Sequence, residues 1–210
     1  MAATYNNLYL DARKRLREAG VEGAQLEARE LVCCAAGKSR EQFYRDMALY
    51  ASDPVEEKLA ELLERRLAGE PVAYLIGEWE FYGLGLDITP DVLIPRMDTE
   101  VLAERAILLA RAAGEGARVL DLCAGSGCVG LAVAANVPGC RVVLADVSEA
   151  ALRLCKQNVR RNELNARVTC LSVDAMEPPS SALWDFDVIV SNPPYIPPET
   201  FGSGSLRAGL

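Results

Sequence analysis

Four consecutive residues near the end of the chain could hold a planar amino group: Asn192, Pro193, Pro194 and Tyr195. They follow an apolar run, Val188, Ile189 and Val190, and a turn-forming serine. Such a run predicts a buried strand, and the two prolines prevent it from continuing. An asparagine amide, proline backbone without N–H donors and a tyrosine ring suit a planar NH2 group. Ligands bind at the carboxyl ends of strands in open α/β sheets, so we expect these four residues to be catalytic.

Three earlier predicted strand ends carry a second group of candidate residues. The first strand turns into a helix through Asp121 and the loop Cys123, Ala124, Gly125, Ser126 and Gly127. Glycines let a ligand approach the backbone there, and N–H groups at the helix start attract a negative group. Asp146 ends the second strand, where it could accept hydrogen bonds from ribose hydroxyls. Asp174 ends the third, where it could meet the amino group of adenine. Together they would bind one adenosine.

The amino-acid end of the ligand is indicated by Asp121. Gly125, Gly127 and Gly130 also match the G-x-G-x-x-G pattern of dinucleotide oxidoreductases, which is the alternative to consider. A carboxylate ahead of the turn would repel a pyrophosphate but attract an amino group. Singly, Asp146 and Asp174 fit ordinary turn residues, and Cys128 fits a packing role. The joint spacing favours S-adenosylmethionine.

The elements that must position these residues follow a βαβ rhythm. Strands are predicted at 118–122, 141–146, 168–173 and 187–190, with helices at 128–137 and 148–162 between them. This alternation predicts a doubly wound parallel sheet of α/β class. Before it, residues 1–70 predict a small helical bundle, with capping boxes at Ser39 and Asp53. Residues 71–98 alternate in a way that predicts a β-hairpin linker, and Asp98 or Thr99 could cap a helix running to about residue 113. The domain that contains the parallel sheet is predicted to span residues 99–210.

Composition limits the classes of function. The chain has seven cysteines and no histidine, so we expect no metal site and no Ser-His or Cys-His hydrolase. Residues 1–100 carry 12 Lys and Arg against 19 Asp and Glu, so direct nucleic-acid binding is not expected. The absence of a signal peptide and of a run of about 20 apolar residues predicts a cytoplasmic protein without membrane contact, which we expect to be a monomer.

At this point the sequence resembles the HemK/PrmC family, the release factor glutamine N5-methyltransferases. The similarity extends to about Pro197 and includes the helical N-terminal domain, the hairpin with Gly77, the segment Leu93–Glu100, and the candidate residues above. It implies a class I, Rossmann-like methyltransferase that transfers a methyl group from S-adenosylmethionine to the glutamine of the Gly-Gly-Gln motif in peptide chain release factors. The N-terminal bundle would help to recognise the release factor.

The resemblance also implies site residues. The cofactor would contact Asp121, the Cys123–Gly127 loop, Asp146, the Asp174 and Ala175 neighbourhood, and Asn192. The substrate glutamine would lie on Asn192, Pro193 and Tyr195.

The chain departs from the family pattern in three places. Cys123 and Ala124 stand where the family often has Gly-Thr, and Met97 replaces a common proline. Residues 199–210 do not resemble the family's continuation, so the sheet is expected to be incomplete and the chain to turn over poorly. The alternatives are an adenine N6 DNA methyltransferase, which also acts on a planar NH2 group, and a cofactor-binding fragment without turnover.

Overall fold

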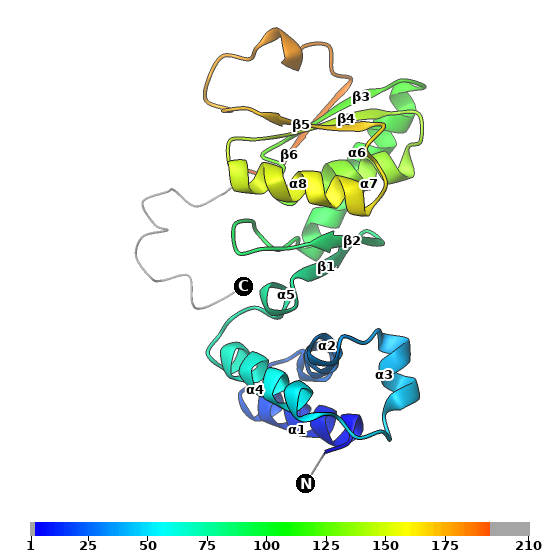
Figure 1. The fold of residues 1–210 in the computed structure, drawn as a ribbon. Coiled ribbons are helices and arrows are strands. Elements are labelled where there is room, and N and C mark those ends of the chain that lie inside the picture. The colour runs from blue at the N-terminus through cyan, green and yellow to red at the C-terminus, as the bar shows by residue number, and fades with distance from the viewer. Residues whose placement is uncertain (1–2, 194–210) are drawn as a thin grey trace. The chain divides into compact units, whose positions relative to one another are not determined.

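The computed structural model describes residues 3–193, so Pro194 and Tyr195 lie outside the described residues. The chain forms two compact units that divide between Ile76 and Gly77. This division assigns residues 71–76 to the N-terminal unit and the hairpin to the C-terminal unit (Figure 1). Within the described part of the chain, the structure has no helix long and apolar enough to cross a membrane.

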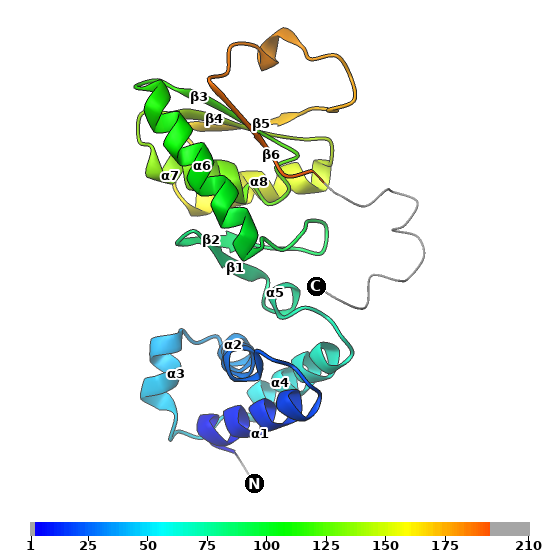
Figure 2. The same ribbon diagram turned by 180° about the vertical axis from the view of Figure 1, so that it is seen from behind.

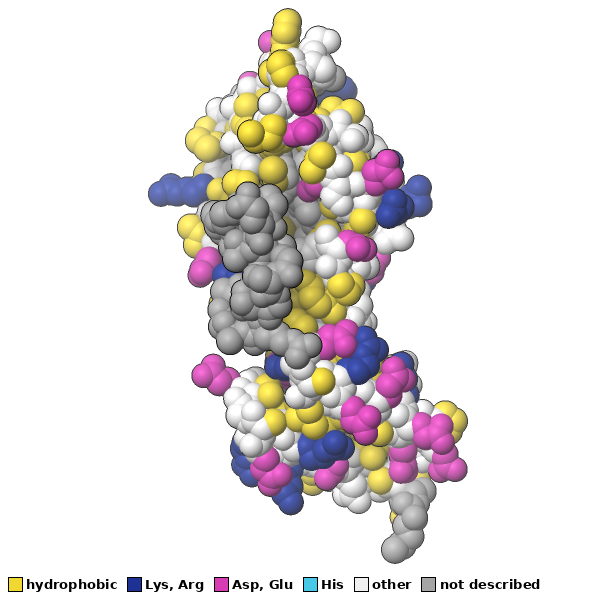
Figure 3. Space-filling view, turned by 90° about the vertical axis from the view of Figure 1, so that its left-hand side faces the viewer, with side chains coloured by type: hydrophobic (Ala, Val, Ile, Leu, Met, Phe, Trp, Pro, Cys, Tyr) yellow, Lys and Arg dark blue, Asp and Glu magenta, His cyan; other side chains and the backbone are white. Residues whose placement is uncertain are grey.

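The N-terminal unit is a helical bundle. Its helices are α1 (Tyr5–Glu18), α2 (Ala24–Ala36), α3 (Arg40–Asp46), α4 (Asp53–Leu67) and α5 (Val72–Ile76). Leu16, Leu31 and Phe43 are among the side chains that fill its core. Acidic and basic side chains are interspersed on the face of this unit seen in Figure 3. Ion pairs such as Arg66–Glu27 and Lys38–Asp46 join them.

Of the two capping boxes expected at helix starts in this unit, the structure contains one. Ser39 and Gln42 form one at α3, with both reciprocal bonds present, which confirms that prediction. The prediction of a second box at Asp53 is wrong, because α4 already includes Asp53 and follows Ser52 without a side-chain cap. Glu56 instead accepts a hydrogen bond from the backbone N–H of Ala3 at 2.9 Å.

The segment between the bundle and the hairpin is also helical rather than extended. A strand with one buried face would bury every second residue, but in α5 the neighbours Val72 and Ala73 are both buried, together with Leu75. Gly77, at φ 76°, follows this helix. The hairpin itself is confirmed as β1 (Glu78–Phe81) and β2 (Leu84–Asp87), which pair antiparallel.

Within residues 77–193, the C-terminal unit contains a four-stranded parallel sheet (Figures 1 and 2). Its strands are β3 (Arg118–Leu122), β4 (Arg141–Asp146), β5 (Val168–Ser172) and β6 (Val188–Ser191), in the order β5-β4-β3-β6. The helices are α6 (Met97–Ala113), α7 (Cys128–Asn136) and α8 (Glu149–Arg161), with a short 3-10 turn at Ser181–Leu183. The predicted α/β class with a parallel, Rossmann-like sheet is confirmed.

Strand order and register determine where the loops meet. The chain moves outward from β3 through β4 to β5 and then returns to the other side of β3, so the topology switches at β3. Leu122 lies opposite both Ser191 and Ala145, and Asp146 lies opposite Ser172. The residues that follow β3 and β6 therefore leave the sheet at the same level.

Helices α6, α7 and α8 lie on the same side of the sheet in both ribbon views (Figures 1 and 2). Every residue of α7 from Cys128 to Ala134 is buried, as expected of a helix packed between a sheet and its neighbours. The start of α6 differs from the prediction: Arg96 occupies the N-cap, and Asp98 and Thr99 are already inside the helix. Glu100 accepts a hydrogen bond from Tyr82 N at 3.1 Å.

Candidate functional site

A pocket lies at the switch point, where β3 and β6 end. Six of the residues predicted from sequence line it: Asp121, Cys123, Ala124, Gly125, Ser126 and Asn192. Sequence reasoning missed its other lining residues, which are Leu93, Ile94, Pro95, Thr99, Cys128 and Val129. The parallel register explains the meeting of residues separated by about seventy positions, because Leu122 and Ser191 are partners. The structure therefore joins the first strand end and the last around one cavity.

Asp121 is the buried acid of this pocket, with only 3% of the residue exposed. Its Oδ2 accepts a hydrogen bond from the backbone N–H of Gly130 at 2.8 Å. Gly130 is in the first turn of α7, where backbone N–H groups lack partners within the helix. Burial raises the pKa of Asp121 to about 7, the Gly130 bond lowers it, and the charge of Asp146 raises it. This carboxylate would be stabilised by a cation in the pocket.

The loop after β3 is held at its backbone N–H and C=O groups. Ala124 N donates to Ala145 O at 3.0 Å, and Gly127 N donates to Ala124 O at 2.7 Å. Gly125 and Gly127 have left-handed φ values of 56° and 81°, which glycine adopts at little cost. Cys123 also adopts a left-handed φ, of 64°, without being glycine. The loop thus depends on backbone shape more than on side-chain identity.

Asp146 supports the loop from the end of β4. Its Oδ2 accepts from Gly125 N and its Oδ1 from Ser148 N, both at 2.9 Å. Each carboxylate oxygen can accept a further hydrogen bond, so the side chain is oriented and still able to bind hydroxyl groups. Asp146 does not line the pocket itself, but it is one hydrogen bond away from the lining residue Gly125.

Asp174 and Ala175 are exposed and do not line this pocket. β5 ends at Ser172, before the predicted end, and Asp174 Oδ1 accepts from Met176 N at 2.9 Å. This bond closes a local turn, which agrees with the alternative interpretation of Asp174 as an ordinary turn residue.

The end of β6 is fixed to β3 by a side chain. Ser191 Oγ donates to Leu122 O at 2.7 Å, one residue before Asn192. Asn192 is half-buried and lines the pocket, whereas Pro193 is exposed. The expected contacts of Pro194 and Tyr195 lie outside the described residues.

Uncharged residues from two segments complete the lining of the pocket. Cys128 is buried, and burial raises the pKa of its thiol to about 12, which supports the packing role expected for it. Leu93, Ile94 and Pro95 approach from the segment before α6, while the neighbouring Arg96 is exposed. Their apolar types gave no chemical signal, and only the position of this segment could have indicated them.

Family models match both units of the chain. A model described as the PrmC N-terminal domain matches residues 7–77, and one described as the methyltransferase small domain matches residues 85–200. Among solved structures, the N-terminal domain of human METTL16 in complex with SAH is 22% identical, with a TM-score of 0.45 over 56% of this chain and 49% of that chain.

Three curated relatives are named release factor glutamine methyltransferase. The Bordetella pertussis protein is 45% identical over 87% of this chain and 67% of its own length. The Geobacter sulfurreducens protein is 40% identical over 88% and 63%, and the Moorella thermoacetica protein is 37% identical over 89% and 65%. The chain thus spans roughly two thirds of the length of these relatives. On both the family models and the identity to these relatives, the chain belongs to the release factor glutamine methyltransferase family.

Proposed function

We propose that this chain binds S-adenosylmethionine in the pocket at the switch point and transfers its methyl group to a side-chain amide nitrogen. The proposed acceptor is the glutamine of the Gly-Gly-Gln motif in peptide chain release factors. The observation that carries the proposal is the pocket itself, in which the buried Asp121 and the half-buried Asn192 meet from two strands. Family membership supports the choice of a protein glutamine as the acceptor.

The donor set around the pocket fits the cofactor. Asp121 would attract the amino group of the methionine portion. In the Cys123–Gly127 loop, Ala124, Gly125 and Gly127 already donate within the protein, so the N–H of Ser126 would bind the carboxylate. Asp146 would accept the ribose hydroxyls. Asp174 and Ala175, which do not line the pocket, are proposed to lie beside adenine. Asn192 would contact both the cofactor and the acceptor. S-adenosylmethionine, when bound, supplies an electrophilic methyl group.

The acceptor needs orientation more than it needs a strong base. An amide nitrogen is a weak nucleophile because its lone pair is delocalised into the carbonyl group. We assign Asn192 Oδ1 and Pro193 O as acceptors for its two N–H groups, while Pro194 stiffens the backbone and Tyr195 packs on the amide plane. Both oxygens are neutral, so they would fix the nitrogen without deprotonating it first. On gaining the methyl group the nitrogen would release one proton to water, and S-adenosylhomocysteine would be the leaving group. This is catalysis by positioning and electrostatics.

The proposal extends to the partner and the compartment. The release factor would be recognised in part by the helical N-terminal unit. The chain would act as a cytoplasmic monomer and would not bind nucleic acid directly.

The test uses labelled S-adenosylmethionine with either a release factor or duplex DNA. We expect label in the release factor and none when its Gly-Gly-Gln glutamine is replaced by alanine. Asn192→Ala should abolish transfer and leave most of the affinity for S-adenosylhomocysteine, while Asn165→Ala, at an exposed position, serves as the matched control. Normal transfer by Asn192→Ala would remove that residue from the mechanism. Label in DNA alone would favour adenine as the acceptor, and bound cofactor without any transfer would leave only a binding role.

A further inference from the structure

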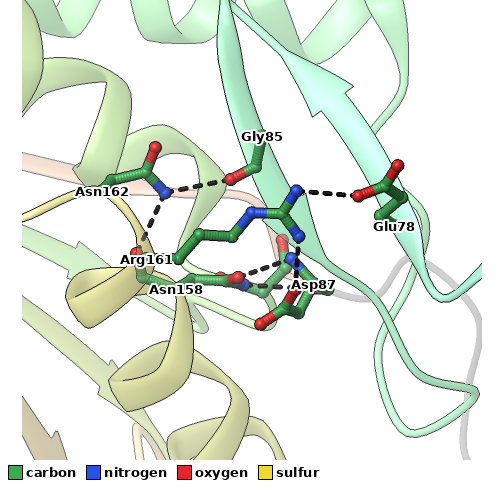
Figure 4. A network of polar contacts seen from close by, with 7 residues as sticks. Glu78, Gly85, Asp87, Asn158, Arg161 and Asn162 are labelled. Atoms are coloured by element: carbon green, nitrogen blue, oxygen red, sulfur yellow. Dashed lines mark hydrogen bonds and ion pairs between the residues drawn. The ribbon is translucent and has the colours of Figure 1, made fainter. Parts of the chain in front are cut away.

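One polar side chain of α8 joins the pocket loop to the hairpin. Asn158 is completely buried, with 0% of its surface exposed. Its Oδ1 accepts from Asp87 N at 2.6 Å, and its Nδ2 donates to Asp87 O at 3.1 Å (Figure 4). The same Nδ2 donates to Ser126 O at 3.0 Å. A single amide therefore satisfies backbone groups of β2 and of the pocket loop.

The chemistry of this position requires an amide. Both N–H donors of Asn158 meet carbonyl oxygens, and its oxygen meets an N–H group. An aspartate would present a second oxygen to the two carbonyls in place of the donors. An apolar side chain would leave three backbone groups without this partner in a buried place, which is unfavourable.

A second residue of α8 holds the adjacent carbonyl of the loop. Cys155 Sγ donates to Gly125 O at 3.2 Å, and Cys155 and Asn158 are three residues apart, so they share a face of the helix. Two consecutive loop carbonyls, those of Gly125 and Ser126, are thus bound from α8. Because a trans peptide directs its N–H away from its carbonyl, the N–H of Ser126 is turned away from α8. Gly125 and Ser126 line the pocket, whose described lining includes no residue of α8.

The neighbours of Asn158 on α8 contact the hairpin in a different way. Asn162 Nδ2 donates to Gly85 O and to Asn158 O, both at 3.0 Å, and Arg161 forms ion pairs with Glu78 and Asp87 (Figure 4). None of these contacts reaches the pocket loop. Asn162 therefore offers a matched control, since it is the same residue type, one turn later, and its bond outside α8 goes to the hairpin.

We infer that Asn158 is a positioning residue of the methyl-donor site: by holding Ser126 O and the backbone of Asp87 together, it keeps the Cys123–Gly127 loop in the shape that binds the cofactor. This inference rests on the proposed function for its ligand, but the bonds that carry it are independent of any ligand. It adds to the pocket a determinant that touches neither cofactor nor acceptor.

The experiment compares the full chain with Asn158→Asp and Asn162→Asp. Amide hydrogen exchange is measured first without ligand, followed by titration with S-adenosylhomocysteine. We expect faster exchange in residues 123–131 for Asn158→Asp and not for Asn162→Asp. We also expect a Kd about tenfold higher or more for Asn158→Asp, and within about twofold of the unaltered chain for Asn162→Asp. In methyl transfer, the KM for the cofactor should rise while kcat at saturating cofactor changes little.

The outcomes separate the inference from the proposed function. If the unaltered chain binds S-adenosylhomocysteine and both variants bind and exchange alike, the positioning role is overturned and the proposed function stands. If the unaltered chain fails to bind, the proposed cofactor is wrong, and the exchange result without ligand still decides whether Asn158 shapes the loop. Should Asn158→Asp not fold, Asn158→Ala replaces it, because alanine places no carboxylate against the two carbonyls.

Discussion

Replacing Asp121 with asparagine should stabilise the unliganded protein while weakening its affinity for the cofactor. The asparagine has nearly the same shape, and its oxygen can still accept the Gly130 N–H bond that Asp121 Oδ2 accepts at 2.8 Å. What it removes is a negative charge in a site that is 3% exposed. Burial is the main reason that the pKa of Asp121 is raised from 3.8 to about 7.

The size of the effect follows from that pKa. Between about pH 4 and pH 7, the folded protein retains a proton on Asp121 that the unfolded chain releases, so the free energy of unfolding falls as pH rises. The full difference corresponds to about 4 kcal/mol above pH 7. The Asp121→Asn variant has no such proton to lose. It should therefore match the unaltered protein near pH 4 and exceed it in stability by up to about 4 kcal/mol at pH 8.

Cofactor affinity should move in the opposite direction. An ammonium group in the pocket is attracted only by the ionised carboxylate, which is about 3% of the molecules at pH 5.5 and about half at pH 7. The affinity of the unaltered chain for S-adenosylhomocysteine should rise about 15-fold over this range. The chain has no histidine, so this residue type adds no titration near neutral pH. In Asp121→Asn, affinity should be lower and nearly independent of pH.

Urea unfolding at pH 4, 6 and 8, together with calorimetric titration at pH 5.5 and 7, tests both parts. The reasoning is refuted if the two proteins lose stability in parallel as pH rises. It is also refuted if Asp121→Asn retains the pH dependence of binding shown by the unaltered chain.

Two further substitutions test the packing behind the pocket and the placement of Asn192. The methyl group added by Gly130→Ala would overlap the Leu144 side chain and lie 3.1 Å from Asp121 Oδ2. We expect this variant to lower the free energy of unfolding, measured by urea titration, by about 1–3 kcal/mol. Gly139→Ala, whose added carbon would meet Glu115 at an ordinary 3.6 Å, should cost clearly less, and equal losses would contradict the packing argument. Ser191→Ala removes the 2.7 Å bond to Leu122 O and should cost about 1 kcal/mol while lowering methyl transfer more than cofactor affinity. The exposed Ser172→Ala is its control, and an unchanged transfer rate in Ser191→Ala would show that this bond does not place Asn192.

The sheet and the strand-end residues were predictable because periodicity and turn residues are local signals. The strands at 118–122 and 141–146 have the expected bounds, and parallel pairing then brings Asp121 and Asn192 to one pocket. Asp174 shows the limit of this argument. A position just after a strand predicts which edge a residue occupies, but the turn that binds Met176 N decides where its carboxylate lies.

Other features depend on tertiary contacts that no local pattern encodes. Residues 72–76 form a helix with Val72, Ala73 and Leu75 buried, although the alternation of apolar residues there predicts a strand. Asn158 belongs to a predicted helix and carries no signal of its own in the sequence, yet it is fully buried against two segments more than thirty residues away. Leu93 to Pro95 line the pocket through apolar side chains that are chemically indistinguishable from core residues.

The level at which the parallel strands end has a consequence for how such a site can change over evolutionary time. β3 supplies the buried acid and the loop, β4 supplies the carboxylate that supports that loop, and β6 supplies Asn192, each from a separate strand end. A substitution of Tyr195 would therefore alter a residue assigned to the acceptor alone, whereas a substitution of Asn192 would affect both the acceptor and the methyl donor. Residues after Asn192 could thus set the acceptor while Asp121, the Cys123–Gly127 loop and Asp146 keep their roles toward the methyl donor.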